Sequence, residues 1–230
     1  SMSQSPENAI TRRRFLTAAT GAVAFPTIIP SSALGLGKRP APSERVNLAA
    51  IGFGTIAHAT VPGFLQDEHV QVVAVADPAK DLSNYGYRGE RRGGREVGKG
   101  IIDKHYGNTA CKTYEDYRTL LDKEDVDAVN VSAPDHWHAH MAIYCARKGK
   151  HIYGQKPLAL TVAEGRRMVK EVTAAGVTWQ TGSQHRSGLY FREAVEFVRN
   201  RRRGKLKVIQ VGLPGGHRDV NQMAHRQGPE

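Results

Sequence analysis

The sequence has little cysteine, few aromatic residues and no long apolar run. Its two cysteines, Cys111 and Cys145, fall in different predicted elements of the 230-residue chain. A disulfide framework or a cysteine metal site needs more cysteines at closer spacing. We therefore expect both thiols to be buried as small hydrophobic side chains, in a protein that folds without a disulfide.

The absence of a long apolar run excludes a membrane-spanning helix. The stretch from Phe15 to Ile29 is only mildly apolar and contains glycine, threonine and proline. A helix that spans a bilayer needs about 20 consecutive apolar residues. No other segment comes closer, so we expect no stable membrane insertion.

Basic residues outnumber acidic ones, and the formal net charge is +11. Part of the excess lies near the N-terminus, and the rest includes two clusters. The clusters are Arg88, Arg91, Arg92 and Arg95, and Arg199, Arg201, Arg202 and Arg203. Surfaces that bind single-stranded nucleic acid interleave such charges with aromatic side chains that stack on bases. That pattern is missing, so we expect no nucleic-acid partner.

The first forty residues resemble an export signal. Ser1 before Met2 is typical of a cloning remnant. Thr11–Leu16 contains a twin-arginine pattern, an apolar stretch follows, and Ser31–Ala33 offers a small-residue cleavage site. This order indicates a Tat signal. We expect residues 1–40 to be signal peptide and linker, the Tat export machinery to be a partner, and the protein to be periplasmic; a plain basic tail is the alternative.

Apolar strands and amphipathic helices alternate along the rest of the chain. The predicted strands are 46–51, 70–76, 110–112, 127–132, 150–154, 177–181 and 205–212. The predicted helices are 55–66, 97–106, 113–122, 136–148, 162–175 and 188–201. This alternation predicts an α/β fold, a doubly wound parallel sheet covered by helices on both faces.

Several local signals refine these boundaries. Thr161 and Glu164 form a capping box, and Thr113 with Asp116 resembles one. Pro62 lies inside the first predicted helix and should kink or restart it. The long, basic, glycine-rich segment 79–108 is either an active-site loop or a surface excursion.

A glycine turn between the first strand and the first helix carries the clearest functional signal. Gly52, Gly54 and Ala57 fit the dinucleotide pattern G-x-G-x-x-A, and an acidic residue, Asp77, ends the next strand. Glycine permits the tight turn and a close approach of the backbone to a diphosphate, and the helix start offers free N–H groups. We expect cofactor contacts from Gly52, Phe53, Gly54, Thr55 and Ile56.

Asp77 is placed to accept hydrogen bonds from a ribose diol. Its carboxylate would repel a 2′-phosphate, which favours NAD over NADP. Lys80 and Arg88 lie close enough in the sequence to leave NADP open.

Polar residues also follow three later strands, where an open α/β sheet places its ligand crevice. These stretches are Ser132–His138, Gly154–Pro157 and Thr181–Arg186. His136 and His140 could share a helix face, but no third ligand stands at motif spacing. We therefore expect no metal.

These motifs, in this order, resemble the glucose–fructose oxidoreductase, inositol dehydrogenase and MocA-like family over residues 44–212. The family has Ser/Thr-Pro-Asn-x-x-His after its fourth strand and Glu-Lys-Pro after its fifth. Pro134 and His138 fit the first motif, with Asp135 in place of Asn. Lys156 and Pro157 fit the second, with Gln155 in place of Glu.

The resemblance implies that the lysine touches the nicotinamide ribose and the substrate and assists proton transfer. That role falls on Lys156, and further cofactor contacts fall on Ser132, Pro134, His138, Gln155 and Lys156 itself. His138 and Arg186 are candidate substrate contacts. A neutral amide beside Lys156 should leave the pKa of its amine lower than a carboxylate would.

The resemblance also implies domains and an activity. We expect an NAD(P)-binding Rossmann domain at 44–180 and the beginning of a C-terminal substrate and oligomerisation domain at 181–230. The expected activity is NAD(P)-dependent hydride transfer at a hydroxyl-bearing carbon of a sugar, polyol or derivative, in a homo-oligomer when full length. The family's usual second-domain His and Asp would lie beyond Glu230. A redox-neutral NAD-dependent glycoside hydrolase and a non-catalytic dinucleotide-binding protein remain as alternatives.

Overall fold

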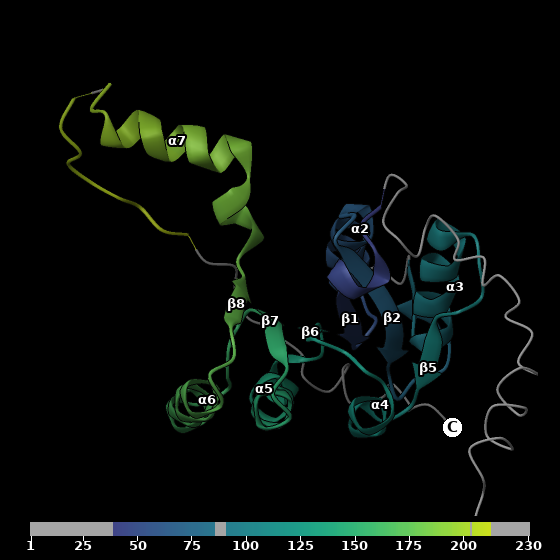
Figure 1. Ribbon diagram of the computed structural model, residues 1–230. Helices are drawn as coiled ribbons and strands as arrows, with labels where there is room; N and C mark the ends of the chain where they lie inside the picture. The colour runs from purple at the N-terminus through teal and green to yellow at the C-terminus, as the bar shows by residue number, and fades with distance from the viewer. Residues whose placement is uncertain (1–38, 86–90, 203, 213–230) are drawn as a thin grey trace, which may run out of the picture. The chain divides into compact units, whose positions relative to one another are not determined.

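The computed structural model describes residues 39–85, 91–202 and 204–212 (Figure 1). The contacts divide the chain between Ser43 and Glu44. The described sheet and helices that position the site all follow that division. The predicted export signal lies outside the described residues.

Six parallel strands form the central sheet, in the order β5-β2-β1-β6-β7-β8. The strands are β1 (Val46–Ile51), β2 (Val70–Ala76), β5 (Lys112–Tyr114), β6 (Ala128–Val131), β7 (His151–Gln155) and β8 (Trp179–Gly182). From β1 the chain builds outward to β2 and β5, and then returns to build outward from β6. The point between β1 and β6 is therefore a topological switch point, where such sheets bind ligands. The predicted doubly wound fold is confirmed.

Helices cover both faces of the sheet. Alternate residues of β1 point to opposite faces, so Leu48 and Ala50 pack with one set of helices while Ala49 and Ile51 pack with the other. The first set is α2 (Ala57–Gln66) and α3 (Arg95–Tyr106). The second is α4 (Tyr117–Lys123), α5 (His138–Arg147) and α6 (Val162–Ala175).

Capping residues set the helix starts. At α6 the predicted capping box is confirmed, with the Thr161 side chain and the Glu164 side chain each bonding the other residue's backbone N–H. The box predicted at Thr113 is wrong, because Thr113 lies in β5. Asp116 caps α4 directly by accepting a hydrogen bond from the N–H of Arg118, so strand and helix both lie later than predicted.

The described parts of the segment after β2 contain β3 (Leu82–Tyr85), β4 (Arg91–Gly93) and α3, with β3 and β4 antiparallel. The predicted restart of the first helix at Pro62 is wrong, since α2 runs through it as one helix.

The apolar side chains of α7 (Leu189–Arg199) are largely exposed, including Phe191, Val195 and Val198. The Phe191 ring lies against the ring of His185, at 4.5 Å between centroids. The strand predicted at 205–212 is wrong for the described chain, because a strand needs a neighbour for its hydrogen bonds and these residues pair with none of the described strands.

Both cysteines are buried and free, as predicted. Cys111 packs with α2 and α3, and Cys145 packs with the cluster on the opposite face. Within the described residues, no helix combines the length and the apolar character that a bilayer crossing needs.

Candidate functional site

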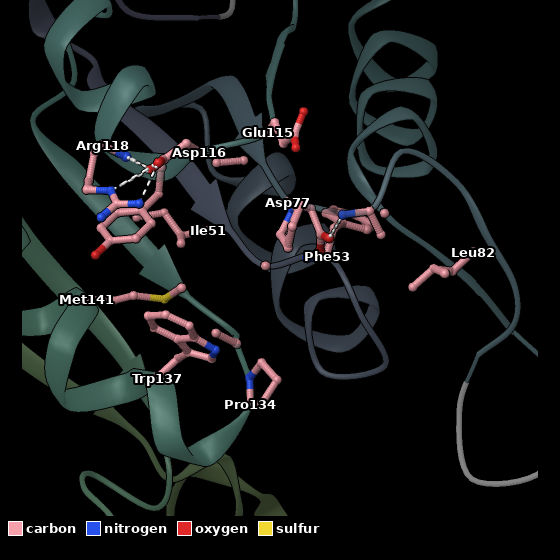
Figure 2. Close-up of a pocket in the computed structure, with 17 residues that line it drawn as sticks. Ile51, Phe53, Asp77, Leu82, Glu115, Asp116, Arg118, Pro134, Trp137 and Met141 are labelled. Carbon is pink, nitrogen blue, oxygen red and sulfur yellow. Dashed lines mark hydrogen bonds and ion pairs between the residues drawn. The ribbon is translucent and has the colours of Figure 1, made fainter. Parts of the chain in front are cut away.

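A pocket of about 480 Å³ opens where the sheet strands end, across the switch point (Figure 2). Its wall comes from the segments that follow β1, β2, β5 and β6, together with the first turns of α4 and α5. The lining residues are Ile51, Gly52, Phe53, Ala76, Asp77, Pro78, Ala79, Leu82, Gly94, Glu115, Asp116, Tyr117, Arg118, Ala133, Pro134, Trp137 and Met141.

The glycine turn closes the end of β1 against β6. Gly52 has φ +82°, and a Cβ there would lie 2.8 Å from the carbonyl oxygen of Ser132. Only glycine fits this backbone and this contact. The next N–H groups, of Gly54, Thr55 and Ile56, donate no hydrogen bond to another described residue. They stand free at the start of α2, as an anion site requires.

Phe53 is held from two sides. Its carbonyl oxygen accepts a hydrogen bond from the N–H of Gly94 at 2.9 Å. Its ring is buried against α3, where a Cβ on Gly98 would lie 2.5 Å from a ring carbon. The segment after β2 therefore supports the glycine turn, and its Leu82 and Gly94 line the pocket.

Asp77 ties β2 to the glycine turn. One carboxylate oxygen accepts the N–H of Phe53 at 2.7 Å, and the other accepts the N–H of Ala79 at 2.8 Å. A carboxylate has about four lone-pair positions, so further acceptor capacity remains toward the pocket. Lys80 is exposed beside Ala79, whereas Arg88 lies outside the described residues.

A chain of buried and half-buried polar side chains connects β6 with the start of α2. The Ser132 hydroxyl lies 3.3 Å from the Asn130 side-chain oxygen, and the Asn130 amide donates to Thr60 at 3.3 Å. Thr60 in turn donates to the carbonyl oxygen of Ile56 at 3.2 Å. Ser132 therefore supports the glycine turn from below, and it does not line the pocket.

Other residues that line the pocket were not identified as site residues from the sequence. The Arg118 guanidinium donates to the Asp116 carboxylate from Nε and from Nη2, at 2.6 Å for the latter. These bonds lower the pKa of Asp116. Tyr117 joins this pair, Trp137 approaches from the 3-10 turn Asp135–Trp137 just before α5, and Met141 approaches from α5 itself. Trp137 stands inside a stretch that the sequence did single out, next to Pro134, which lines the pocket as well.

Lys156 and its neighbours lie beside the pocket and are not part of its lining. Lys156 is exposed after β7, and within the described residues its amine makes no hydrogen bond or ion pair. Gln155 is 2% exposed, and neither atom of its amide has a partner in the described chain. Arg186 is exposed beyond β8.

His138 is placed differently from the predicted ligand contact. It is buried at the start of α5, and its ring nitrogens face the carbonyl oxygens of Ala133 and Pro157. His136 and His140, on either side of Trp137, are exposed.

Sheet order, switch-point pocket, glycine turn and acidic strand end together define a Rossmann domain of the dinucleotide-binding class. The chain belongs to the Gfo/Idh/MocA oxidoreductase family with an NAD-binding Rossmann fold, whose family model matches residues 46–183. The family resemblance drawn from the motifs is thereby confirmed.

Individual relatives agree with this assignment. A myo-inositol 2-dehydrogenase of Thermotoga maritima is 35% identical over 100 residues, covering 44% of this chain and 30% of the relative. An alpha-N-acetylgalactosaminidase of Shewanella oneidensis is 33% identical over 173 residues, covering 67% of this chain and 35% of the relative. The crystal structure of a probable dehydrogenase from Thermotoga maritima superposes with a TM-score of 0.53 at 26% identity, covering 67% and 41%. The chain thus spans about a third of the length of these two curated relatives.

Proposed function

We propose that this chain is the dinucleotide-binding part of an NAD(P)-dependent oxidoreductase that acts on a hydroxyl-bearing carbon of a sugar, polyol or derivative. The observation that carries the proposal is the set of N–H groups of Gly54, Thr55 and Ile56, which donate to no other described residue and follow the pocket-lining Gly52 and Phe53 in a turn bonded to the Asp77 carboxylate. A diphosphate fits the free N–H groups, and a ribose diol fits the Asp77 carboxylate.

The pocket wall also fits the remainder of an adenosine. It is mostly apolar and is lined by two aromatic residues, Trp137 and Tyr117. Trp137 lies near Pro134 and Met141 (Figure 2). A planar base gains contact area against aromatic rings. The residues present therefore fit a dinucleotide, and NAD fits better than NADP because Asp77 is a carboxylate.

Each residue then has a definable task. The turn amides bind the diphosphate, and Asp77 fixes the ribose while holding the N–H of Phe53. Lys156, at the end of β7 and free of other partners in the described chain, accepts the proton that leaves the substrate hydroxyl. The nicotinamide, when bound, accepts the hydride from the same carbon.

The test is a screen of polyols and sugars for NADH formation. Substrate-dependent absorbance of NADH that disappears in Lys156→Met supports the proposal. Full-length protein that binds NAD and reduces it with no member of the panel would instead indicate a non-catalytic dinucleotide-binding protein.

A redox-neutral glycoside hydrolase is the second candidate. The Shewanella oneidensis relative named alpha-N-acetylgalactosaminidase matches 173 residues of this chain. Against it, Lys156 and Pro157 carry the lysine motif that the resemblance to the oxidoreductase family assigns to proton transfer. Cleavage of an N-acetylgalactosaminide without net NADH would favour the hydrolase, and NADH accumulation would exclude it.

We further propose that the protein is exported and carries its cofactor with it. The twin-arginine pattern at Thr11–Leu16 supports this, since Tat carries folded proteins, and free dinucleotide is scarce outside the cytoplasm. Residues 181–230 would begin a second domain that completes the substrate site and a homo-oligomer. Fusing residues 1–40 to a reporter tests the export: the reporter should reach the periplasm, and changing both Arg12 and Arg13 to Lys should retain it inside.

A further inference from the structure

His138 joins two loops of the crevice. Its side chain is 2% exposed. Ring nitrogen Nε2 lies 2.8 Å from the carbonyl oxygen of Ala133, and Nδ1 lies within hydrogen-bond distance of the carbonyl oxygen of Pro157. One imidazole therefore bridges the segment after β6 and the segment after β7.

Those two segments carry different parts of the proposed site. Ala133 lines the pocket, whereas Pro157 directly follows Lys156. Since the Lys156 amine has no partner among the described residues, nothing in its own contacts holds it toward the pocket. The bridge through His138 fixes the backbone from which Lys156 projects relative to the pocket wall.

The hydrogen bonds of the His138 imidazole limit its capacity to bind a ligand. Both partners are carbonyl oxygens, which accept and cannot donate, and a neutral imidazole has one N–H. Whichever ring nitrogen carries the proton donates to one carbonyl oxygen, and the other nitrogen faces the second carbonyl oxygen at close range. Neither nitrogen is then left to meet a substrate or a nicotinamide.

We propose that His138 is a positioning residue, which holds the Lys156 segment at a set distance from the dinucleotide pocket by bonding both loops at once. The proposal replaces the ligand contact that the motif suggested for His138. It rests on the proposed function, because the position of Lys156 matters only if a dinucleotide occupies the pocket.

The experiment measures whether bound nucleotide shields Lys156. The chain is treated with an amine-acylating reagent with and without saturating NAD, and modification is quantified by mass spectrometry, with exposed Lys170 on α6 as the internal reference. We expect NAD to protect Lys156 in the wild type and in the surface control His140→Gln. His138→Leu should bind NAD with unchanged affinity by calorimetry and lose the protection, and His138→Gln, which keeps one donor group, should recover part of it.

Three outcomes overturn the proposal. These are a wild type that binds NAD without protecting Lys156, a His138→Leu variant whose protection equals that of the wild type, and a variant that loses NAD binding altogether. Absence of NAD binding in the wild type would instead refute the proposed function itself. The bridge is then still tested by a crystal structure of the wild-type protein, in which both ring nitrogens of His138 should face the carbonyl oxygens of Ala133 and Pro157; a ring turned away from either oxygen contradicts the bridge, whatever the variants do.

Discussion

The carboxylate of Asp77 accepts a hydrogen bond from the backbone N–H of Phe53 at 2.7 Å. The end of β2 is thereby attached to the middle of the glycine turn, so the residue expected to bind ribose also shapes the diphosphate site. The N–H of Phe53 already donates to Asp77, so the N–H groups available to a diphosphate are those of Gly54, Thr55 and Ile56.

Replacing Asp77 by Asn should weaken NAD binding and reduce the preference over NADP. Asn keeps one acceptor oxygen and loses the charge, so it can satisfy only one of the two N–H groups. Hydrogen bonds to charged groups contribute about 1.5–3 kcal/mol, which corresponds to a loss of about ten- to a hundredfold in affinity. Calorimetric titration with each nucleotide measures both effects, and unchanged affinity for both would contradict the assigned role.

Gly52→Ala should abolish dinucleotide binding and destabilise the fold. The left-handed backbone alone costs about 1–2 kcal/mol for a residue with a Cβ. The clash with the carbonyl oxygen of Ser132 adds to this cost. Gly63→Ala on α2 is the matched control, because its Cβ meets nothing within 4 Å. It should raise the free energy of unfolding by about 0.5–1 kcal/mol. Equal effects of the two changes in urea denaturation would refute the close-contact argument.

Gln155→Met should raise the free energy of unfolding. The amide of Gln155 is buried without a partner in the described chain, and an unsatisfied buried polar group costs about 1–3 kcal/mol. Met fills similar space without that penalty.

Gln155→Glu should lower the free energy of unfolding. Burial disfavours the charged form of the new carboxyl group, so this group loses its proton at a lower pH in the unfolded chain than in the folded protein. The free energy of unfolding should therefore fall as pH rises above the ordinary pKa of a glutamate, about 4.3. Urea denaturation of both variants at several pH values checks this pair of predictions, and a Glu variant that is stabilised as pH rises would contradict it.

Lys156→Met should lose activity while keeping nucleotide affinity. General acid–base catalysis contributes about 10²–10⁴-fold to rate, and the lysine lies outside the pocket lining. Steady-state kinetics on a substrate from the panel, with NAD affinity measured in parallel, separates the two quantities. A variant that retains wild-type kcat would remove Lys156 from the mechanism.

The two cysteines should resist alkylation in the folded protein. Desolvation by burial raises the pKa of Cys111 and of Cys145 from 9.0 to about 12. At about pH 8 the native thiols should therefore be inert toward iodoacetamide, and both should react in denaturant.

The same shifts predict alkaline destabilisation. Because the unfolded thiols ionise first, the free energy of unfolding should fall as pH rises from about 9 toward about 12. Rapid native alkylation, or stability that is flat over this range, would show that the thiols are accessible.

Much of the fold could be predicted because its signals are local. The ranges 46–51 and 70–76 are continuous apolar runs bounded by a turn glycine and an aspartate, and the structure has both strands at those bounds. The strand at Lys112–Tyr114 was predicted two residues early, because Thr113 mimicked a helix cap. That error concealed Tyr117 and Arg118 as pocket residues.

The missed features depend on tertiary packing. The spacing of the motif predicted a ligand contact for His138, but the structure buries its side chain. Its burial between two carbonyl oxygens depends on the loop after β7, which is distant in the sequence. The strand predicted at 205–212 failed for a related reason, since its pattern is apolar but none of the described strands lies beside it.

The central claim is that the glycine turn binds a nicotinamide dinucleotide, and calorimetry on the folded chain tests it most directly. Denaturation of the purified protein followed by nucleotide analysis first establishes how much cofactor is already bound. We expect one NAD per chain, either released in that step or bound in titration, with Gly52→Ala showing neither. Folded wild-type protein that releases no nucleotide and gives no heat with NAD, NADH or their 2′-phosphorylated forms would contradict the claim.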